Sequence, residues 1–134
     1  MKKIPPIEEV MTPFAYSVEI DESVGVAEDM MIDHEIRHLA VTDSGALVGV
    51  ISDRDIAFTA NTAESDLRDR LHVRDVCSLD VYAVDRSEQL DRVLAEMAER
   101  HIGSAIVTDG GKIAGVFTAT DACRHFAEFL RSRE

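Results

Sequence analysis

Two stretches of the chain share one pattern of apolar and polar positions, offset by 66 residues. Residues 36–56 (IRHLAVTDSGALVGVISDRDI) and 102–122 (IGSAIVTDGGKIAGVFTATDA) each hold two apolar runs around a glycine-bearing turn. This pattern predicts two adjacent strands joined by a tight turn, in which glycine supplies the positive φ. A Ser/Thr-x-x-Asp step after the second run predicts the start of a closing helix. The chain is therefore built from two copies of one unit.

Each hairpin is preceded by a predicted strand and helix. The β-like stretches are residues 16–20 and 81–84. The second helix has apolar residues at the spacing of one helical face, namely Leu90, Val93, Leu94, Met97 and Ala98. The first is weaker, with Val24, Ala27 and Met31 on one face. We expect Met31 and Met97 to fill the core, which makes each copy a β-α-β-β-α unit.

These elements predict an α+β fold in which two repeats pack sheet to sheet with pseudo-twofold symmetry, because neither repeat can bury its sheet alone. Residues 1–60 hold an N-terminal arm and the first repeat, 61–71 form a polar linker, and 72–134 hold the second repeat with a C-terminal helix. The arm, residues 1–9, is expected to be extended because Pro5-Pro6 disfavour a helix.

The composition excludes several classes of protein. The net charge of −12 argues against nucleic acid as a partner, since phosphate backbones repel such a surface. No apolar run is long enough to span a membrane and the N-terminus lacks a signal peptide, so we expect a cytoplasmic protein. The two cysteines form no C-x-x-C pair, which argues against a disulfide framework or a structural zinc site.

Residues 34–38 (HEIRH) match the H-E-x-x-H zinc-protease motif. That chemistry needs both histidines on one helical face with the glutamate as general base. Strand-like residues begin directly at Leu39, however, and the second copy has Arg100, His101 and Ser104 at the corresponding positions. We therefore expect no metal site, and no catalytic constellation recurs elsewhere.

The Ser52-x-x-Asp55 and Thr118-x-x-Asp121 steps allow two interpretations. In the first, hydroxyl and carboxylate form a capping box that only stabilises the helix. In the second, the helix N-terminus and hydroxyl bind a phosphate while the carboxylate accepts the hydroxyl groups of a ribose. Gly49 or Gly115 would let backbone or ligand come close.

The order of motifs resembles a tandem pair of CBS domains, a Bateman module. In the first copy these are VMTP at 10–13, A-x-x-x-M-x-x-x-x-I-R-H-L at 27–39 and DSGALVGVISDRDI at 43–56. The second, opened by VCS at 76–78, has HIGSAIV at 101–107 and GVFTATD at 115–121. The resemblance covers roughly residues 8–130, so a stand-alone module without an attached enzyme is expected.

The resemblance implies a non-catalytic regulatory module that binds AMP, ADP or ATP in clefts between its repeats, without requiring a cofactor. By similarity, Asp55 and Asp121 would hold ribose hydroxyls, and Ser52 and Thr118 the phosphate. Three further groups complete the implied site. The residues entering each hairpin are Arg37, His38, Gly103 and Ser104, and the stretches near the adenine include Tyr16, Val18, Val81 and Ala83. The basic side chains that would neutralise phosphate are Arg37, His38 and Arg54, with Arg124 a weaker candidate. Each arginine is equally well explained as a solvated surface charge.

Two alternatives remain open. The ligand could be S-adenosylmethionine, or the chain could be an interaction and dimerisation module with vestigial clefts. The second copy has Ala119-Thr120 where the first has Asp53-Arg54, so the two clefts need not bind the same ligand. The resemblance also implies a homodimer through the apolar faces of the closing helices, at Phe58, Phe126 and Phe129, and an unknown downstream protein.

Overall fold

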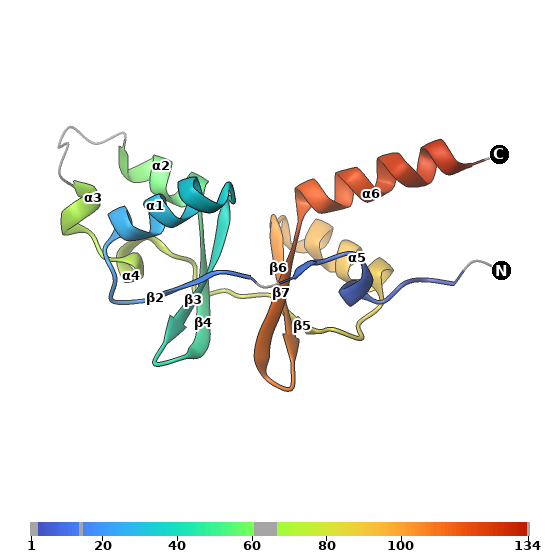
Figure 1. Cartoon of the computed structure of the whole chain (residues 1–134), viewed down its shortest axis with the longest axis horizontal. Coiled ribbons are helices and arrows are strands. Elements are labelled where there is room, and N and C mark those ends of the chain that lie inside the picture. The colour runs from blue at the N-terminus through green and yellow to red at the C-terminus, as the bar shows by residue number, and fades with distance from the viewer. Residues whose placement is uncertain (1–2, 14, 61–66, 134) are drawn as a thin grey trace. The chain divides into compact units, whose positions relative to one another are not determined.

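The computed structural model describes residues 3–13, 15–60 and 67–133. The chain forms two compact units (Figure 1), which we call the first unit (Tyr16–Val81) and the second unit (the residues up to Ala15 together with those from Tyr82). Each carries one β-α-β-β-α repeat, and the predicted α+β fold class is confirmed. Sheet-to-sheet packing of the repeats stays a prediction, and residues 61–66 of the predicted linker lie outside the described residues.

The first unit begins with β2 and ends with three helices. Its elements are β2 (Ser17–Glu19), α1 (Val24–His34), β3 (His38–Asp43), β4 (Ala46–Ser52), α2 (Asp53–Ala60), α3 (Leu67–Arg70) and α4 (Val73–Val76). The second unit has the same β-α-β-β-α order after a short N-terminal segment. Its elements are the 3₁₀ helix η1 (Ile7–Glu9), β1 (Thr12–Pro13), β5 (Ala83–Asp85), α5 (Leu90–Arg100), β6 (Ser104–Asp109), β7 (Lys112–Thr118) and α6 (Ala119–Ser132).

The two sheets have matching topology. In the first unit the strand order is β2-β3-β4, with β2 parallel and β4 antiparallel to β3. In the second it is β1-β7-β6-β5, with the same directions for β5, β6 and β7. Both hairpins shift register at the same place, after Val41 and after Val107. The predicted turns are confirmed, since Gly45 and Gly111 have φ values of 86° and 83°.

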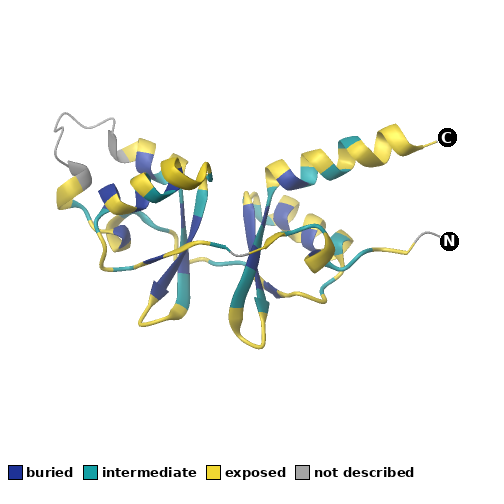
Figure 2. Ribbon diagram, viewed as in Figure 1, coloured by how far each residue is buried: buried dark blue, intermediate teal, exposed yellow. Residues whose placement is uncertain are grey.

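Each unit buries its own apolar cluster between its sheet and its helices (Figure 2). In the first unit, Leu39 and Ile51 from the strands meet Met31 of α1. In the second, Phe117 of β7 is fully buried and packs in one cluster with Met97 of α5. Both methionines are therefore core residues, as predicted.

The segments that open each repeat in sequence pair with the sheet of the other repeat, and so belong to the same compact unit as that sheet. The backbone of Thr12 and Pro13 pairs with β7, while Ser78 exchanges two 2.9 Å hydrogen bonds with Val50 of β4. The N-terminal arm is not simply extended as expected, because Ile7 is fully buried in the core of the second unit and begins a 3₁₀ turn. Through this pairing, residues 3–13 lie in the second unit and residues 72–78 in the first, while the division of the chain at residues 60 and 72 stays a prediction.

Candidate functional site

Residues predicted to contact a ligand gather at one edge of the first unit's sheet. Because β2 and β3 are parallel and β4 is antiparallel, the starts of β2 and β3 lie where β4 ends. At this edge the Tyr16 carbonyl accepts a hydrogen bond from the Ala40 amide (3.1 Å), and His38 is paired with Ser52. The second unit places Tyr82, Ser104 and Thr118 in the same way.

The first hydroxyl–carboxylate pair forms a helix cap at this edge. The Ser52 amide donates to Asp55 Oδ2 (2.9 Å), and the Asp55 amide donates to Ser52 Oγ (3.2 Å). These are the reciprocal bonds of a capping box. Asp55 stays half-buried, so one of its carboxylate oxygens can accept a further donor.

The second pair forms the same box with additional bonds. The Thr118 amide (3.0 Å) and hydroxyl (3.1 Å) both donate to Asp121 Oδ2, while the Asp121 amide donates back to Thr118 Oγ1 (3.2 Å). Arg124 Nη1 donates to Asp121 Oδ1 at 3.0 Å. Asp121 is 4% exposed, so this carboxylate is both buried and paired.

Two backbone carbonyls hold the first residue of each closing helix. The Asp53 amide donates to the Arg37 carbonyl and the Ala119 amide to the Gly103 carbonyl, each at 2.9 Å. The residues before β3 and β6 therefore fix the helix N-termini through their backbone. The Arg37 side chain is exposed and remains available to a ligand.

The other predicted residues differ in their exposure. Arg54, Gly103 and Ala83 are exposed, whereas His38 and Val81 are half-buried and Ser104 is buried. The Val18 side chain lies in the core of the first unit. Tyr16 is 44% exposed.

At both glycines that were predicted to allow a close approach, the group that comes close is backbone of the chain itself. A Cβ added at Gly49 would lie 2.6 Å from the Ser78 carbonyl oxygen, and one at Gly115 would lie 2.5 Å from that of Thr12. Both glycines thus admit a neighbouring backbone, one of the two possibilities that the sequence left open.

A tyrosine contact at the same edge was not predicted. The Tyr16 ring stacks on His34 with centroids 3.8 Å apart, and Arg100 lies 5.1 Å from the centroid of Tyr82. Burial, followed by the nearby carboxylates of Glu96 and Glu88, raises the pKa of Tyr82. The two pairs are offset by 66 residues, so the repeat relates one contact to the other.

The H-E-x-x-H residues do not share a helical face. Helix α1 ends at His34, Glu35 adopts a left-handed conformation (φ 54°), and His38 begins β3. Across residues 3–13, 15–60 and 67–133, no cluster of three potential metal ligands occurs. His34 and His38 are therefore not presented on one helical turn, which is the arrangement that the zinc-protease motif uses.

Cys77 lies near the first-unit carboxylate. Burial raises the pKa of the Cys77 thiol, and the negative charge of Asp55 adds to that effect. A thiol with a raised pKa forms less of the reactive thiolate at neutral pH. The charge of Asp55 is thus one of two causes that disfavour the Cys77 thiolate, after burial.

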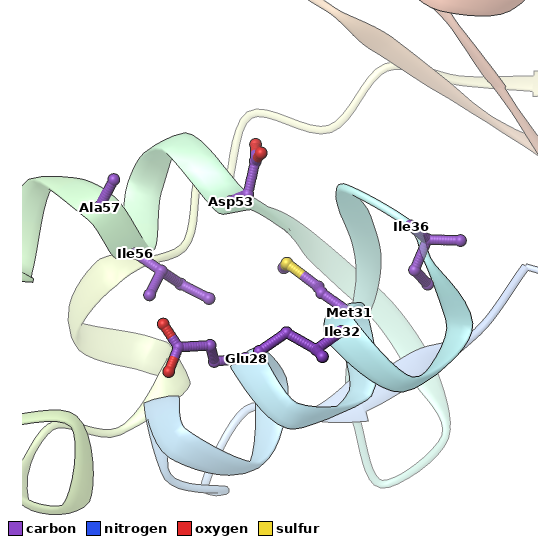
Figure 3. Close-up of a pocket in the computed structure, with 7 residues that line it drawn as sticks. All are labelled: Glu28, Met31, Ile32, Ile36, Asp53, Ile56 and Ala57. Carbon is purple, nitrogen blue, oxygen red and sulfur yellow. The ribbon is translucent and has the colours of Figure 1, made fainter.

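A pocket of about 390 Å³ opens between α1 and α2 of the first unit. Figure 3 shows its apolar side chains, including Met31 and Ile56, together with the carboxylates of Glu28 and Asp53. The sequence did not predict this pocket.

Among the helices described, none is long and apolar enough to cross a membrane.

The fold and the site define a tandem α+β repeat with a hydroxyl–carboxylate helix cap at the same position in both copies. The chain belongs to the CBS domain family, which matches residues 7–60 and 73–128. The predicted resemblance is confirmed.

Curated relatives include much longer proteins. The chain is 32% identical over 116 residues to homoserine O-acetyltransferase of Methanocorpusculum labreanum and 32% over 114 residues to inosine-5′-monophosphate dehydrogenase of Nitrosopumilus maritimus. Each match covers 84% of this chain but only 22% of the relative. The CBS domain-containing protein YhcV of Bacillus subtilis is 23% identical over 115 residues, covering 86% of this chain and 81% of YhcV.

Solved CBS structures share the fold. The CBS domain pair of MJ0100, in complex with 5′-methylthioadenosine and S-adenosyl-L-methionine, has a TM-score of 0.84 and 23% identity, covering 95% of this chain and 99% of that one. CBSX2 in complex with AMP has a TM-score of 0.74 and 24% identity, covering 94% and 98%. These likenesses confirm the architecture of a CBS domain pair.

Proposed function

We propose that this chain is a non-catalytic, cytoplasmic regulatory module that binds an adenosine-containing ligand, AMP, ADP or ATP. Binding would change how the module presents itself to a second copy or to a downstream protein. The net charge of −12 favours small molecules and proteins over nucleic acid as partners.

The observation that carries this proposal is the hydroxyl–carboxylate pair at the same sheet edge in each unit. A carboxylate can accept both hydroxyl groups of a ribose. Beside Asp55, the Ser52 hydroxyl can donate to a phosphate, and the exposed Arg37 and Arg54 can neutralise its charge.

The base would lie against the edge that carries Tyr16. Its ring is partly exposed, and Val18 would contribute backbone because its side chain is buried. In the second unit, Val81 and Ala83 would supply the corresponding surface. His38, Gly103 and Ser104 would border the ligand where each hairpin begins.

Solved relatives support an adenosyl ligand. MJ0100 was solved with 5′-methylthioadenosine and S-adenosyl-L-methionine, and CBSX2 with AMP. These ligands share an adenosine group, which the proposed ribose and base contacts would recognise.

Isothermal titration calorimetry tests the proposal with AMP, ADP, ATP and S-adenosylmethionine on the wild type, Asp55→Asn and Asp121→Asn. We expect at least one nucleotide to bind and at least one of these substitutions to weaken it tenfold or more. Asp75→Asn is the matched control, because Asp75 forms a capping box on α4 outside the proposed site. The proposal fails if no adenosyl compound binds, and the site assignment fails if binding survives both site substitutions.

S-adenosylmethionine is the second candidate, supported by the likeness to MJ0100. This ligand has a ribose but no phosphate, so it would use Asp55 without Ser52 or Arg54. Ser52→Ala and Arg54→Ala should therefore weaken AMP binding and leave S-adenosylmethionine binding within about twofold. Equal loss for both ligands would contradict this division of roles.

We also propose that the module is a homodimer. Apolar side chains stand exposed on its closing helices, with Phe58 84%, Phe126 61% and Phe129 44% accessible. A second copy would remove this surface from water.

A further inference from the structure

We infer that the first unit holds the working nucleoside site and that Arg124 keeps the carboxylate of the second unit from the ligand. This inference rests on the proposed function. It assigns to Arg124 the opposite of the phosphate-binding role that the sequence suggested for it.

Both oxygens of the Asp121 carboxylate already accept hydrogen bonds from residues at the start of α6. Its Oδ1 accepts from Arg124 at 3.0 Å, and its Oδ2 accepts from both the amide and the hydroxyl of Thr118. The Asp121 side chain is only 6% exposed. A ribose must therefore displace a charge-assisted hydrogen bond and reach a buried group before it can bind.

The corresponding carboxylate of the first unit, Asp55, has no cationic partner among the residues that the structure describes. Among the described residues, Asp55 accepts only from the Ser52 amide, and Asp55 is half-buried. The residue in register with Arg124 is Phe58, which carries no charge and is 84% exposed. The Asp55 carboxylate can therefore accept ribose hydroxyls without losing an ion pair.

The two hydroxyl groups differ in the same direction. Thr118 gives its hydroxyl hydrogen to Asp121, so that hydrogen is already used. The Ser52 hydroxyl accepts from the Asp55 amide but donates to none of the described residues. Only Ser52 therefore has a hydrogen ready for a phosphate oxygen.

The aromatic contacts favour the first unit as well. Tyr82 is half-buried beside Arg100, whereas Tyr16 is 44% exposed. A purine gains more contact from the more exposed ring.

Calorimetric stoichiometry tests which unit binds, with AMP and, separately, S-adenosylmethionine as probes on the full chain. We expect one equivalent per chain, lost in Asp55→Asn and retained within about twofold in Asp121→Asn. Alkylation of Cys77, whose thiol senses the charge of Asp55, gives a second readout. Bound AMP should slow labelling of Cys77 by iodoacetamide in the wild type, but not in Asp55→Asn, where AMP no longer binds. Circular dichroism verifies that each variant is folded.

Two reciprocal substitutions test the role of Arg124. Phe58→Arg places a cation three residues after Asp55, as Arg124 follows Asp121, and should weaken AMP binding roughly tenfold, because a charged hydrogen bond must then be displaced. Phe58→Gln is the matched control, because it removes the same aromatic ring without adding a charge, and it should change the affinity less than twofold. Arg124→Ala should add a second, weaker equivalent.

The outcomes separate this inference from the proposed function. Absence of binding by any adenosyl probe overturns both. Binding lost in Asp121→Asn but kept in Asp55→Asn, or two equivalents in the wild type, overturns only the choice of unit. A single equivalent in Arg124→Ala overturns the role of Arg124, even if Asp55 is essential.

Discussion

At the scale of single residues, Gly49 and Gly115 mark where a strand of each sheet admits a neighbouring backbone. The Ser78 carbonyl occupies the space that a side chain at position 49 would need. Backbone from outside the hairpin can therefore come this close to β4 and β7 at the two glycines because neither residue has a Cβ.

We predict that Gly49→Ala lowers the free energy of unfolding by about 2 kcal/mol, within the usual range for overpacking. The added Cβ would lie 2.6 Å from a backbone oxygen, so a strand must move. Urea denaturation followed by circular dichroism measures the change. Gly110→Asn is the control, since that position has open space and a φ of 59° that asparagine tolerates. Equal stability of both variants would contradict this account.

Glu19 links stability to pH. The Thr42 hydroxyl, followed by the Ser44 amide at 2.9 Å, donates to its carboxylate and lowers the pKa of Glu19. The native state therefore binds fewer protons than the unfolded state when the pH falls below the ordinary glutamate value of about 4.3. The contribution to stability is present above that value and is lost as the pH falls toward the native pKa.

We expect the free energy of unfolding to decrease between about pH 5 and pH 3, and to decrease less steeply in Glu19→Gln, because that variant has no carboxylate to titrate. Urea titrations at several pH values measure this slope. Glu99→Gln removes the same charge from an exposed position of α5 and should leave the slope close to that of the wild type. A slope unchanged by Glu19→Gln would refute the linkage.

Residues of the site were predictable where the contact is local. The bonds between Ser52 and Asp55 join residues three apart at a helix start, so sequence spacing is sufficient to infer them. The stack of Tyr16 on His34 joins residues eighteen apart, across β2 and α1. No spacing rule predicts that contact, because it depends on how the helix returns over the sheet.

At the scale of elements, the hairpins were predictable from the sequence, whereas the packing of the N-terminal arm against the second unit was not. A hairpin needs only alternation and a glycine turn, both of which are local. The 3₁₀ turn at Ile7–Glu9 holds a single buried apolar residue between prolines and glutamates, which gives no periodic signal. Its stability comes from the core of the second unit and from the 2.7 Å bond of the Ile7 amide to the Glu88 carbonyl.

We predict that Ile7→Ala destabilises the protein by about 3 kcal/mol, because it leaves a cavity where a fully buried side chain stood. The neighbouring Ile4 is 42% exposed, so Ile4→Ala should cost less than about 1 kcal/mol. Thermal and urea denaturation of both variants measure the difference. If the two substitutions have the same effect, the arm does not anchor the core as described.

At the scale of the whole molecule, exposed apolar side chains favour a homodimer. Phe126 and Phe129 stack on α6 with centroids 6.4 Å apart, and Leu130 beside them is 49% exposed. Removing a phenylalanine side chain from water is worth about 1.5–3 kcal/mol, so two such residues from each copy can support association.

We predict that multi-angle light scattering gives the wild type twice its chain mass of 14.8 kDa. Phe126→Asp combined with Phe129→Asp should give the mass of one chain, because charged groups would have to be buried at the contact. Leu79→Asp is the control: Leu79 is 67% exposed but lies outside the closing helices, so the dimer should persist. A monomeric wild type would contradict the homodimer and would mean that a single chain carries the function. A double variant that still dimerises would mean that the dimer contact lies on another face.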